Sequence, residues 1–584
     1  MKRLLSFAML FFICGCLGPS KEELAEMERL KAEEAREAEL AAAELDGDKQ
    51  KSIWDAEHIT FEIEWRFGPR FKKALKNRDA DQVARCFTDG FVGQPLTKTA
   101  GGTRVESSSG MIEQKFAKPE ETQELGADAF AADLLEPTQD WESVDAIKLR
   151  VLKISKLGDD SWRTRILIGQ DGMHGSKRVH EKSEHLVDWT IENNDALEDE
   201  PVISRWTMDS RSRGEGSTTA LFAEVTSESG LDQADIPDNW KLDVDDTEQY
   251  RFGVAVEDFN QDGFLDIAAA VYGGRIQLLQ GGPGLKFKDV SRELGLELKG
   301  PLPNFLAAWI DYNNDGFPDL LMGNQLYRNE GGKKFVVATR DSGLLIEKEC
   351  LGATVADYDG DGRLDIYLLY QRDWNGGAAG AAEKWVNEDE TGKRNELWKN
   401  VGDRFLNMTK MAKAGGGKHH THSAAWFFYD DDHLPDLYTA NDFGENVLLQ
   451  NNGDGTFKDI SEASMSSGFA TSMGVATGDI NNDGVNEIYV ANMFSKMGRR
   501  IIAQVDDQDY PDGVYDQIKG SCAGNRLYVR STSEDSCQEL GEAKGISQVG
   551  WAFAPAFSDF NNDGLLDIYS TTGFMSFKRG KPDG

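Results

Sequence analysis

An acidic loop of nine residues recurs along the C-terminal two-thirds of this chain of 584 residues. Side-chain oxygens stand at loop positions one, three, five and nine, and a backbone carbonyl is available at position seven. This largely oxygen shell suits a hard cation with flexible coordination, so we expect calcium rather than magnesium, with about five ions in all. The five well-formed copies read DFNQDGFLD from Asp258, DYNNDGFPD from Asp311, DYDGDGRLD from Asp357, DINNDGVNE from Asp479 and DFNNDGLLD from Asp559.

The expected metal ligands are carboxylates and amides from each loop. The glycine at position six allows the positive φ that a sharp turn requires. A worn sixth copy, FYDDDHLPD, has His433 at that position and has lost its first ligand, so it predicts a weak or empty site. For a single loop the alternative is a polar turn that binds nothing, but repetition in matching contexts favours metal. The predicted ligands are Asp258, Asn260, Asp262, Asp266, Asp311, Asn313, Asp315, Asp319, Asp357, Asp359, Asp361, Asp365, Asp479, Asn481, Asp483, Glu487, Asp559, Asn561, Asp563 and Asp567, with Asp430, Asp432 and Asp436 at the weak site.

Short apolar runs flank every loop, and two further strand-like runs follow it, as in NELWKN and KFKDVSRELGL. Four short strands recurring at a period of about fifty residues are typical of a β-propeller blade. A solenoid is the alternative, but its strands are more uniform. The loops predict six blades, or seven if a degenerate blade is present. The pattern LFAEVTSESGL at Leu221 precedes the first loop, and we expect it to complete the last blade and close the ring.

These phrases resemble the FG-GAP or VCBS repeats of integrin-α-like propellers, and most closely those of the bacterial ASPIC/UnbV group, whose members are similar to cartilage acidic protein. The resemblance covers residues from about Thr218 to the end of the sequence. It implies a mainly β fold in residues 218–584. It also implies an extracytoplasmic binding platform in which calcium ions stiffen the blades.

Residues 1–16 have the features of a lipoprotein signal peptide. Lys2 and Arg3 precede an apolar stretch that is too short for an ordinary membrane span and ends in ICGC. This resembles a bacterial lipobox, which predicts lipidation of Cys16 and a membrane-anchored lipoprotein of the cell envelope. An ordinary secretory signal cut nearby is the alternative. Residues 17–51, rich in Ala, Glu, Leu and Lys, predict a helical tether, and a coiled-coil dimer remains open.

Residues 52–217 contain no acidic loop. A helical pattern is followed by strand-like runs such as AIKLRVLKISKL, which predicts a small α+β domain. The phrase ALKNRDADQVARCFTDGFVG resembles the start of SnoaL-like cone domains, in which a curved sheet wraps around helices. No catalytic residue can be assigned from the spacing here.

Four cysteines follow Cys16. Cys522 and Cys537 flank one strand closely enough to form a disulfide in an oxidising compartment, whereas Cys86 and Cys350 are expected to be buried as small apolar residues. The run KHHTH puts His420 and His422 on one face of a strand. A two-histidine zinc or copper site is therefore conceivable, against the alternative of exposed loop histidines.

A formal net charge of -37 argues against nucleic acid and anionic membrane surfaces as partners. Insertions at residues 374–393 and 494–521 lengthen two blades and are candidates for recognition. We therefore expect a lipid-anchored, calcium-binding propeller that binds protein or polysaccharide at the cell surface and is not an enzyme. The alternatives are an enzyme, with its active site in the α+β domain or the propeller funnel and purely structural calcium, and a structural envelope component.

Overall fold

The computed structural model describes most of the chain from residue 47 onward. The predicted signal peptide, Cys16, most of the tether and residues 374–392 of one insertion lie outside the described residues. None of the described helices is long and apolar enough to cross a membrane. The described ranges are 47–94, 102–106, 110–117, 123–193, 195–218, 222–233, 252–271, 276–296, 306–347, 350–371, 393–402, 404–510, 513–530 and 536–573.

An α+β domain occupies residues 47–217. Its first helix, α3, begins at Gly47, so the boundary predicted at residue 52 falls inside a helix whose Ile53 and Ala56 are buried. Helix propensity alone could not separate a solvated tether from this packed helix. The helices are α3 (Gly47–Glu62), η1 (Ile63–Phe67), α4 (Gly68–Asn77), α5 (Ala80–Ala84), α6 (Ala127–Leu135), η2 (Glu136–Thr138) and α7 (Ala196–Asp199).

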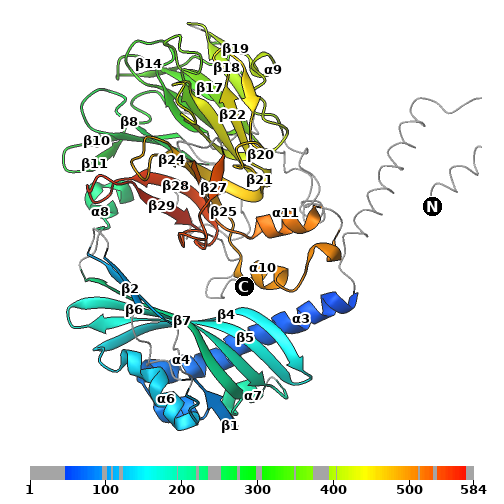
Figure 1. Ribbon diagram of the computed structural model, residues 1–584. Helices are drawn as coiled ribbons and strands as arrows, with labels where there is room; N and C mark the ends of the chain where they lie inside the picture. The colour runs from blue at the N-terminus through cyan, green and yellow to red at the C-terminus, as the bar shows by residue number, and fades with distance from the viewer. Residues whose placement is uncertain are drawn as a thin grey trace, which may run out of the picture.

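The sheet of this domain has strand order β2-β3-β7-β6-β5-β4, with β1 parallel to β7 and the other pairs antiparallel. Helices cover one of its faces (Figure 1). Phe67 and Phe71 on the helical side pack against Trp189 and Trp206 of the sheet, with ring centroids 4.9 to 5.6 Å apart. The strands are β1 (Phe87–Gly93), β2 (Gly102–Glu106), β3 (Ile112–Phe116), β4 (Ser143–Gly158), β5 (Ser161–His174), β6 (Lys177–Thr190) and β7 (Ile203–Ser217).

The repeat region is a series of antiparallel sheets whose four strands are paired in chain order. The fourth and fifth sheets are joined through β21 and β24, and two strands of a sixth are described. The strands are β8 (Phe252–Glu257), β9 (Asp266–Val271), β10 (Ile276–Gly282) and β11 (Lys286–Asp289); β12 (Ala307–Ile310), β13 (Asp319–Met322), β14 (Gln325–Asn329) and β15 (Phe335–Val337); β16 (Cys350–Ala356), β17 (Asp365–Tyr370), β18 (Glu396–Asn400) and β19 (Phe405–Asn407); β20 (His420–Phe427), β21 (Asp436–Glu445), β22 (Val447–Asn451) and β23 (Phe457–Asp459); β24 (Phe469–Gly478), β25 (Glu487–Asn492), β26 (Arg526–Arg530) and β27 (Cys537–Glu539); and β28 (Ala552–Ser558) and β29 (Asp567–Thr572).

Neighbouring sheets pack face to face in sequence order. The first strand of each sheet contacts the first strand of the next, from β8 through to β28. Each apolar layer combines two sheets: Phe259 and Ala268 of the first sheet share a buried cluster with Trp309 and Leu320 of the second. The acidic loops join the first and second strands of every sheet, so they all lie at the same end of the strands.

The insertion at residues 494–521 folds onto the α+β domain. It contains α10 (Lys496–Ile502), η5 (Asp507–Asp509) and α11 (Val514–Ser521), and α10 lies beside α3 and β4 (Figure 1). Arg500 donates two hydrogen bonds to Glu57, at 2.7 and 3.1 Å, and a third of 3.0 Å to the carbonyl of Val151. This insertion, expected to be a recognition loop, instead connects the two parts of the chain.

Candidate functional site

Each acidic loop is held in shape by its own backbone amides. In the first loop the amides of Asp262 and Gly263 donate to the two carboxylate oxygens of Asp258, at 3.1 and 2.8 Å. The amide of Asp262 also donates to the side-chain oxygen of Asn260 at 3.1 Å, and that of Phe264 to Asp262 at 3.0 Å. The side chains at positions one, three and five are thereby turned toward the loop centre. The bonds of positions one and five recur in the loops that start at Asp311, Asp357, Asp479 and Asp559.

The glycine at position six has a left-handed backbone conformation in every well-formed loop, with φ between 82° and 88°. That conformation strains residues with a side chain. In the worn loop His433 adopts it, with φ 63°. The worn loop has the exposed Phe428 at position one, and the amide of Gln450 donates to Asp430 at 2.6 Å. It therefore offers fewer oxygens than the other loops, and a weak site here stays a prediction.

The carboxylate at position nine is buried in every loop except the last, and in the first four sheets it joins the loop to the third strand. Asp319 accepts the amide of Tyr312 at 3.2 Å and that of Asn329 in β14 at 2.7 Å. Burial, reinforced by the nearby Asp311 and Asp315, raises the pKa of Asp319 to about 7. The same cause raises the pKa of its counterparts, to about 6 for Asp266 and Asp436 and about 7 for Asp365 and Glu487.

These donors fit a divalent cation. A buried carboxylate beside two or three other acidic side chains is costly to ionise, and a bound cation offsets that cost. Carboxylate and amide oxygens from four positions match the hard oxygen ligands that calcium prefers. When bound, the ion would supply charge neutralisation and cross-link the loop to the second strand through position nine.

The third loop differs from the other loops because the side chain of a lysine pairs with its carboxylates. Asp357, Asp359 and Asp361 can bring one oxygen each within 4.8 Å of one another. The ammonium group of Lys399 in β18 pairs with Asp359 and lies 3.2 Å from Asp361. These hydrogen bonds raise the pKa of Lys399. Lysine and a metal ion would therefore compete for the same oxygens.

A buried asparagine at the end of the third strand links neighbouring sheets, and the sequence reasoning missed it. The side-chain amide of Asn451 donates to the carbonyl of Tyr358 in the preceding loop at 2.7 Å and to that of Pro435 at 3.1 Å. Its side-chain oxygen accepts the amide of Gly453 at 3.0 Å. The available signal was the asparagine that ends each of the similar runs NQLYRN, NELWKN and NVLLQN. The same three kinds of bond are made by Asn329 and Asn400.

The predicted disulfide between Cys522 and Cys537 is wrong, because both are free thiols. Cys537 lies in β27 at the place of the buried aromatic residue of other fourth strands, whereas Cys522 follows α11 and packs against Gly498 of α10. The two side chains thus belong to different packing environments. Cys86 and Cys350 are buried, as predicted, at 2% and 0% exposure.

The histidine run does not build a larger metal site. His422 lies 3.6 Å from Asp442 and contacts Gln371, and a bulge interrupts β20 between Thr421 and Ser423. In the part of the chain that the structure describes, the only group of three or more His, Cys, Asp or Glu side chains placed to share an ion is that of the third loop.

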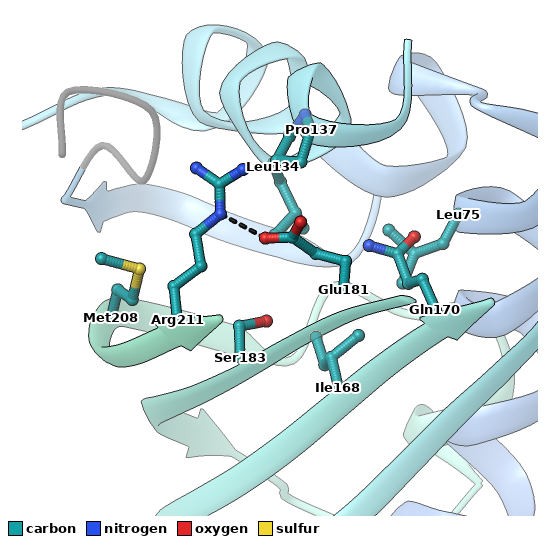
Figure 2. A pocket seen from close by; sticks show the side chains of 9 residues that line it. All are labelled: Leu75, Leu134, Pro137, Ile168, Gln170, Glu181, Ser183, Met208 and Arg211. Atoms are coloured by element: carbon teal, nitrogen blue, oxygen red, sulfur yellow. Dashed lines mark hydrogen bonds and ion pairs between the residues drawn. The ribbon is translucent and has the colours of Figure 1, made fainter. Parts of the chain in front are cut away.

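A polar pocket lies inside the α+β domain, between the sheet and α6 (Figure 2). Glu181 of β6 is 2% exposed and pairs with Arg211 of β7. Burial raises the pKa of Glu181, and Arg211 opposes this effect. Gln170 is directly opposite Glu181 across the sheet. Strand β6 turns Glu181, Ser183 and His185 inward between Val179 and Val187, and that alternation was the sequence signal for these residues.

The repeats define the class of protein. The family model described as FG-GAP-like repeat matches residues 258–322, 311–368 and 429–490, and the chain is an FG-GAP-like repeat protein.

Among curated proteins the chain is similar to cartilage acidic protein 1. It is 32% identical to the Mus musculus protein over 143 residues, which are 22% of this chain and 22% of that protein. It is 22% identical to the Xenopus tropicalis protein over 413 residues, covering 56% of this chain and 58% of that one. The chain therefore spans between 22% and 58% of the lengths of these relatives.

Likenesses to solved structures are low. Saccharomyces cerevisiae Sqt1 matches with a TM-score of 0.30 and 11% identity, over 69% of this chain and 76% of that one. An LEH-like epoxide hydrolase of M. tuberculosis matches with a TM-score of 0.15 and 15% identity, over 26% of this chain and 85% of that one. At these scores neither match carries a conclusion about fold or function.

Proposed function

We propose that the repeat region is a calcium-stabilised β-propeller that binds a protein or polysaccharide outside the cytoplasm. In this proposal a lipid on Cys16 anchors the protein to the membrane. The observation that carries the proposal is the oxygen arrangement repeated in five loops, four of which have a buried carboxylate at position nine: Asp266, Asp319, Asp365 and Glu487. No group in these loops is arranged for chemistry on a substrate, so the ions have a structural role.

Contacts between aromatic side chains support a closed ring. The residue at loop position two packs against the fourth strand of the following sheet: Phe259 against Phe335, with ring centroids 5.7 Å apart, and Tyr358 against Phe457 at the same distance. Phe560 in the last loop makes the equivalent contact with Phe222, at 5.6 Å. Phe222 lies before the first sheet in sequence, so it links the last sheet to the start of the repeat region.

The other side of the same segment meets the first sheet. Gly295, which follows β11, lies against the carbonyl of Phe335 in the second sheet, and Gly230 lies in the same way against the carbonyl of Phe287 in the first. Gly230 follows α8 (Thr226–Ser229), beside η3 (Leu231–Gln233). These contacts support a ring of seven blades, in which the segment would take a seventh place between the sixth and first sheets rather than complete the sixth.

Hydrogen bonds connect neighbouring acidic loops, so calcium bound in one loop can also restrict the motion of the next. The position-four side chain of one loop donates to the position-six carbonyl of the next: Gln261 to Gly316 at 2.5 Å and Asn314 to Gly362 at 2.9 Å. Asn482 donates in the same way to Gly564 at 2.9 Å. An ion that fixes one loop therefore also fixes the partner group of its neighbour.

Calcium dependence is the direct test. Thermal unfolding would be measured in calcium and in excess chelator, with bound ions counted by native mass spectrometry. A single site at a free calcium concentration of 100 times its Kd adds about 2.7 kcal/mol of stability. We expect four or five ions, and the loss of one in Asp311→Asn. The control Asp341→Asn changes an exposed acid outside the loops. No bound ion and no calcium-dependent shift would refute the proposal.

A further inference from the structure

A cleft opens between the third and fourth sheets, at the end of the strands opposite the acidic loops. Its volume is about 720 Å³. Its lining includes Arg394 just before β18, Lys410 of α9 (Thr409–Ala412), Lys413, and the triple glycine 415–417 that leads into β20. These segments connect second to third strands and fourth to first strands, whereas the acidic loops connect first to second strands.

The three cations of this cleft form no ion pair within the described residues. No carboxylate lies within ion-pair distance of Arg394, Lys410 or Lys413 there, although Asp454 interacts with Lys413 from further away. Two carboxylates also line the cleft. The oxygens of Glu396 accept bonds from Tyr370 at 3.2 Å, the indole of Trp398 at 3.0 Å and the side-chain amide of Asn407 at 3.2 Å, and Asp459 accepts the amide and the hydroxyl of Ser461 at 3.0 and 2.5 Å. Three cations beside two hydrogen-bonded carboxylates leave the cleft with a local excess of positive charge in a protein whose net charge is strongly negative.

The triple glycine adds backbone donors to the same cleft. The hydroxyl of Tyr367 donates to the carbonyl of Ala414 at 2.8 Å and so fixes the start of the loop. Gly416 and Gly417 have left-handed conformations, with φ of 59° and 86°. Within the described residues, the amides of glycines 415–417 donate to no protein acceptor. Successive free amides in such conformations form a concave anion-binding surface.

We propose that this cleft binds an anionic sugar of a polysaccharide. The carboxylate or sulfate of the sugar would meet the three cations and the glycine amides. The side-chain amide of Asn407 uses one N–H for Glu396 and has a second N–H for a sugar hydroxyl. Leu449 is the one aliphatic residue among the lining side chains apart from the aliphatic stems of the cations. Such a polar lining suits a polyhydroxylated ligand better than an apolar peptide side chain. The inference rests on the proposed role of the repeat region as a binding platform and names its ligand.

The overall negative charge does not prevent this binding. Screening limits electrostatic effects to about 8 Å at physiological ionic strength. The acidic loops lie at the other end of strands that are about 17 Å long for five residues. Binding should therefore follow the local positive charge, and it should weaken steeply as salt is added.

The test uses defined tetrasaccharides and the intact protein in calcium. Isothermal titration would compare tetragalacturonate and a sulfated heparin tetrasaccharide with neutral maltotetraose and with tetraglutamate. The variants are Arg394→Ala and Lys410→Ala. The control is Lys458→Ala, which removes an exposed lysine from the neighbouring β23 without touching the cleft.

We expect an anionic tetrasaccharide to bind and the neutral one not to. Each cleft variant should weaken binding about tenfold, as expected for one lost charge-assisted hydrogen bond, and Lys458→Ala should leave it unchanged. Preference for galacturonate or for the sulfated sugar identifies the anionic group. Absence of binding, equal loss in the control, or equal binding of tetraglutamate would each overturn the proposal. The ion count in calcium is independent of the cleft, so failure here is distinguishable from failure of the calcium propeller.

Discussion

Replacing Asn451 with alanine should weaken the junction between the third and fourth sheets. The substitution removes three side-chain hydrogen bonds, of 2.7, 3.1 and 3.0 Å, at a residue that is 3% exposed. A hydrogen bond contributes about 1 kcal/mol net, and the carbonyls of the buried Tyr358 and the half-buried Pro435 lose a donor as well. We therefore expect a loss of about 3 to 4 kcal/mol.

The adjacent Asn452 provides a matched control. Its side chain is exposed and makes one hydrogen bond, of 3.0 Å, to Thr456. Asn452→Ala should therefore cost no more than about 0.5 to 1 kcal/mol. The two variants differ by one position in the chain and carry the same chemical change.

Native-state hydrogen exchange read by mass spectrometry is the assay, because it resolves local free energies in a chain with several parts. Protection should fall in β22 and also in the loop that starts at Asp357, which is bonded to Asn451 across the sheets. Equal protection in both variants, or a loss confined to β22, would refute the role of this asparagine as a link between sheets.

Three further predictions concern other residues. Lys399→Gln removes the ammonium group that competes for Asp359 and Asp361, so calcium should bind the third loop more tightly, measured by calcium titration; unchanged affinity would contradict the competition. His185 is fully buried, and burial lowers its pKa from 6.5 to about 3. At His185 the unfolded chain therefore binds more protons between these values, and the contribution of this residue to stability should fall as pH drops below 6.5, by about 2 kcal/mol at pH 5. The raised pKa values of the position-nine carboxylates act in the opposite direction, so the comparison with a variant isolates the effect of His185. His185→Phe should flatten this dependence in urea unfolding, and an unaltered slope would count against it. Cys16→Ser should abolish lipid labelling and release the protein from membranes; retention of label would exclude Cys16 as the modified residue.

The acidic loops could be predicted because their stabilising contacts are local. Among the described residues, every backbone amide that donates to the side chain of Asp258 or Asp262 belongs to the same nine residues, and only the side-chain amide of Gln280 reaches Asp262 from outside the loop, at 3.2 Å. The glycine at position six is likewise needed for the positive φ of the loop itself. The conformation of such a loop is therefore determined mainly by its own nine residues.

Contacts between distant segments could not be predicted in the same way. Asn451 bonds to Tyr358, 93 positions earlier, and nothing near either residue indicates the other. The helix α3 illustrates the same limit. Its sequence predicts a helix, but whether that helix is buried depends on the sheet against which it packs. Alternation divides β6 into two faces, but only the apolar residues Val179 and Val187 indicate which face points inward. Glu181, Ser183 and His185 could be assigned to that face only by counting from these valines.

The positions of the sites separate two roles within one set of sheets. The acidic loops lie at one end of the strands, while the proposed sugar cleft and the insertion that carries Arg500 lie at the other, because they belong to different strand connections. Calcium therefore cannot contact a ligand in the cleft. Any effect of calcium on ligand affinity would have to pass through the rigidity of the sheets, so it should be lost together with the links that Asn329, Asn400 and Asn451 make between them.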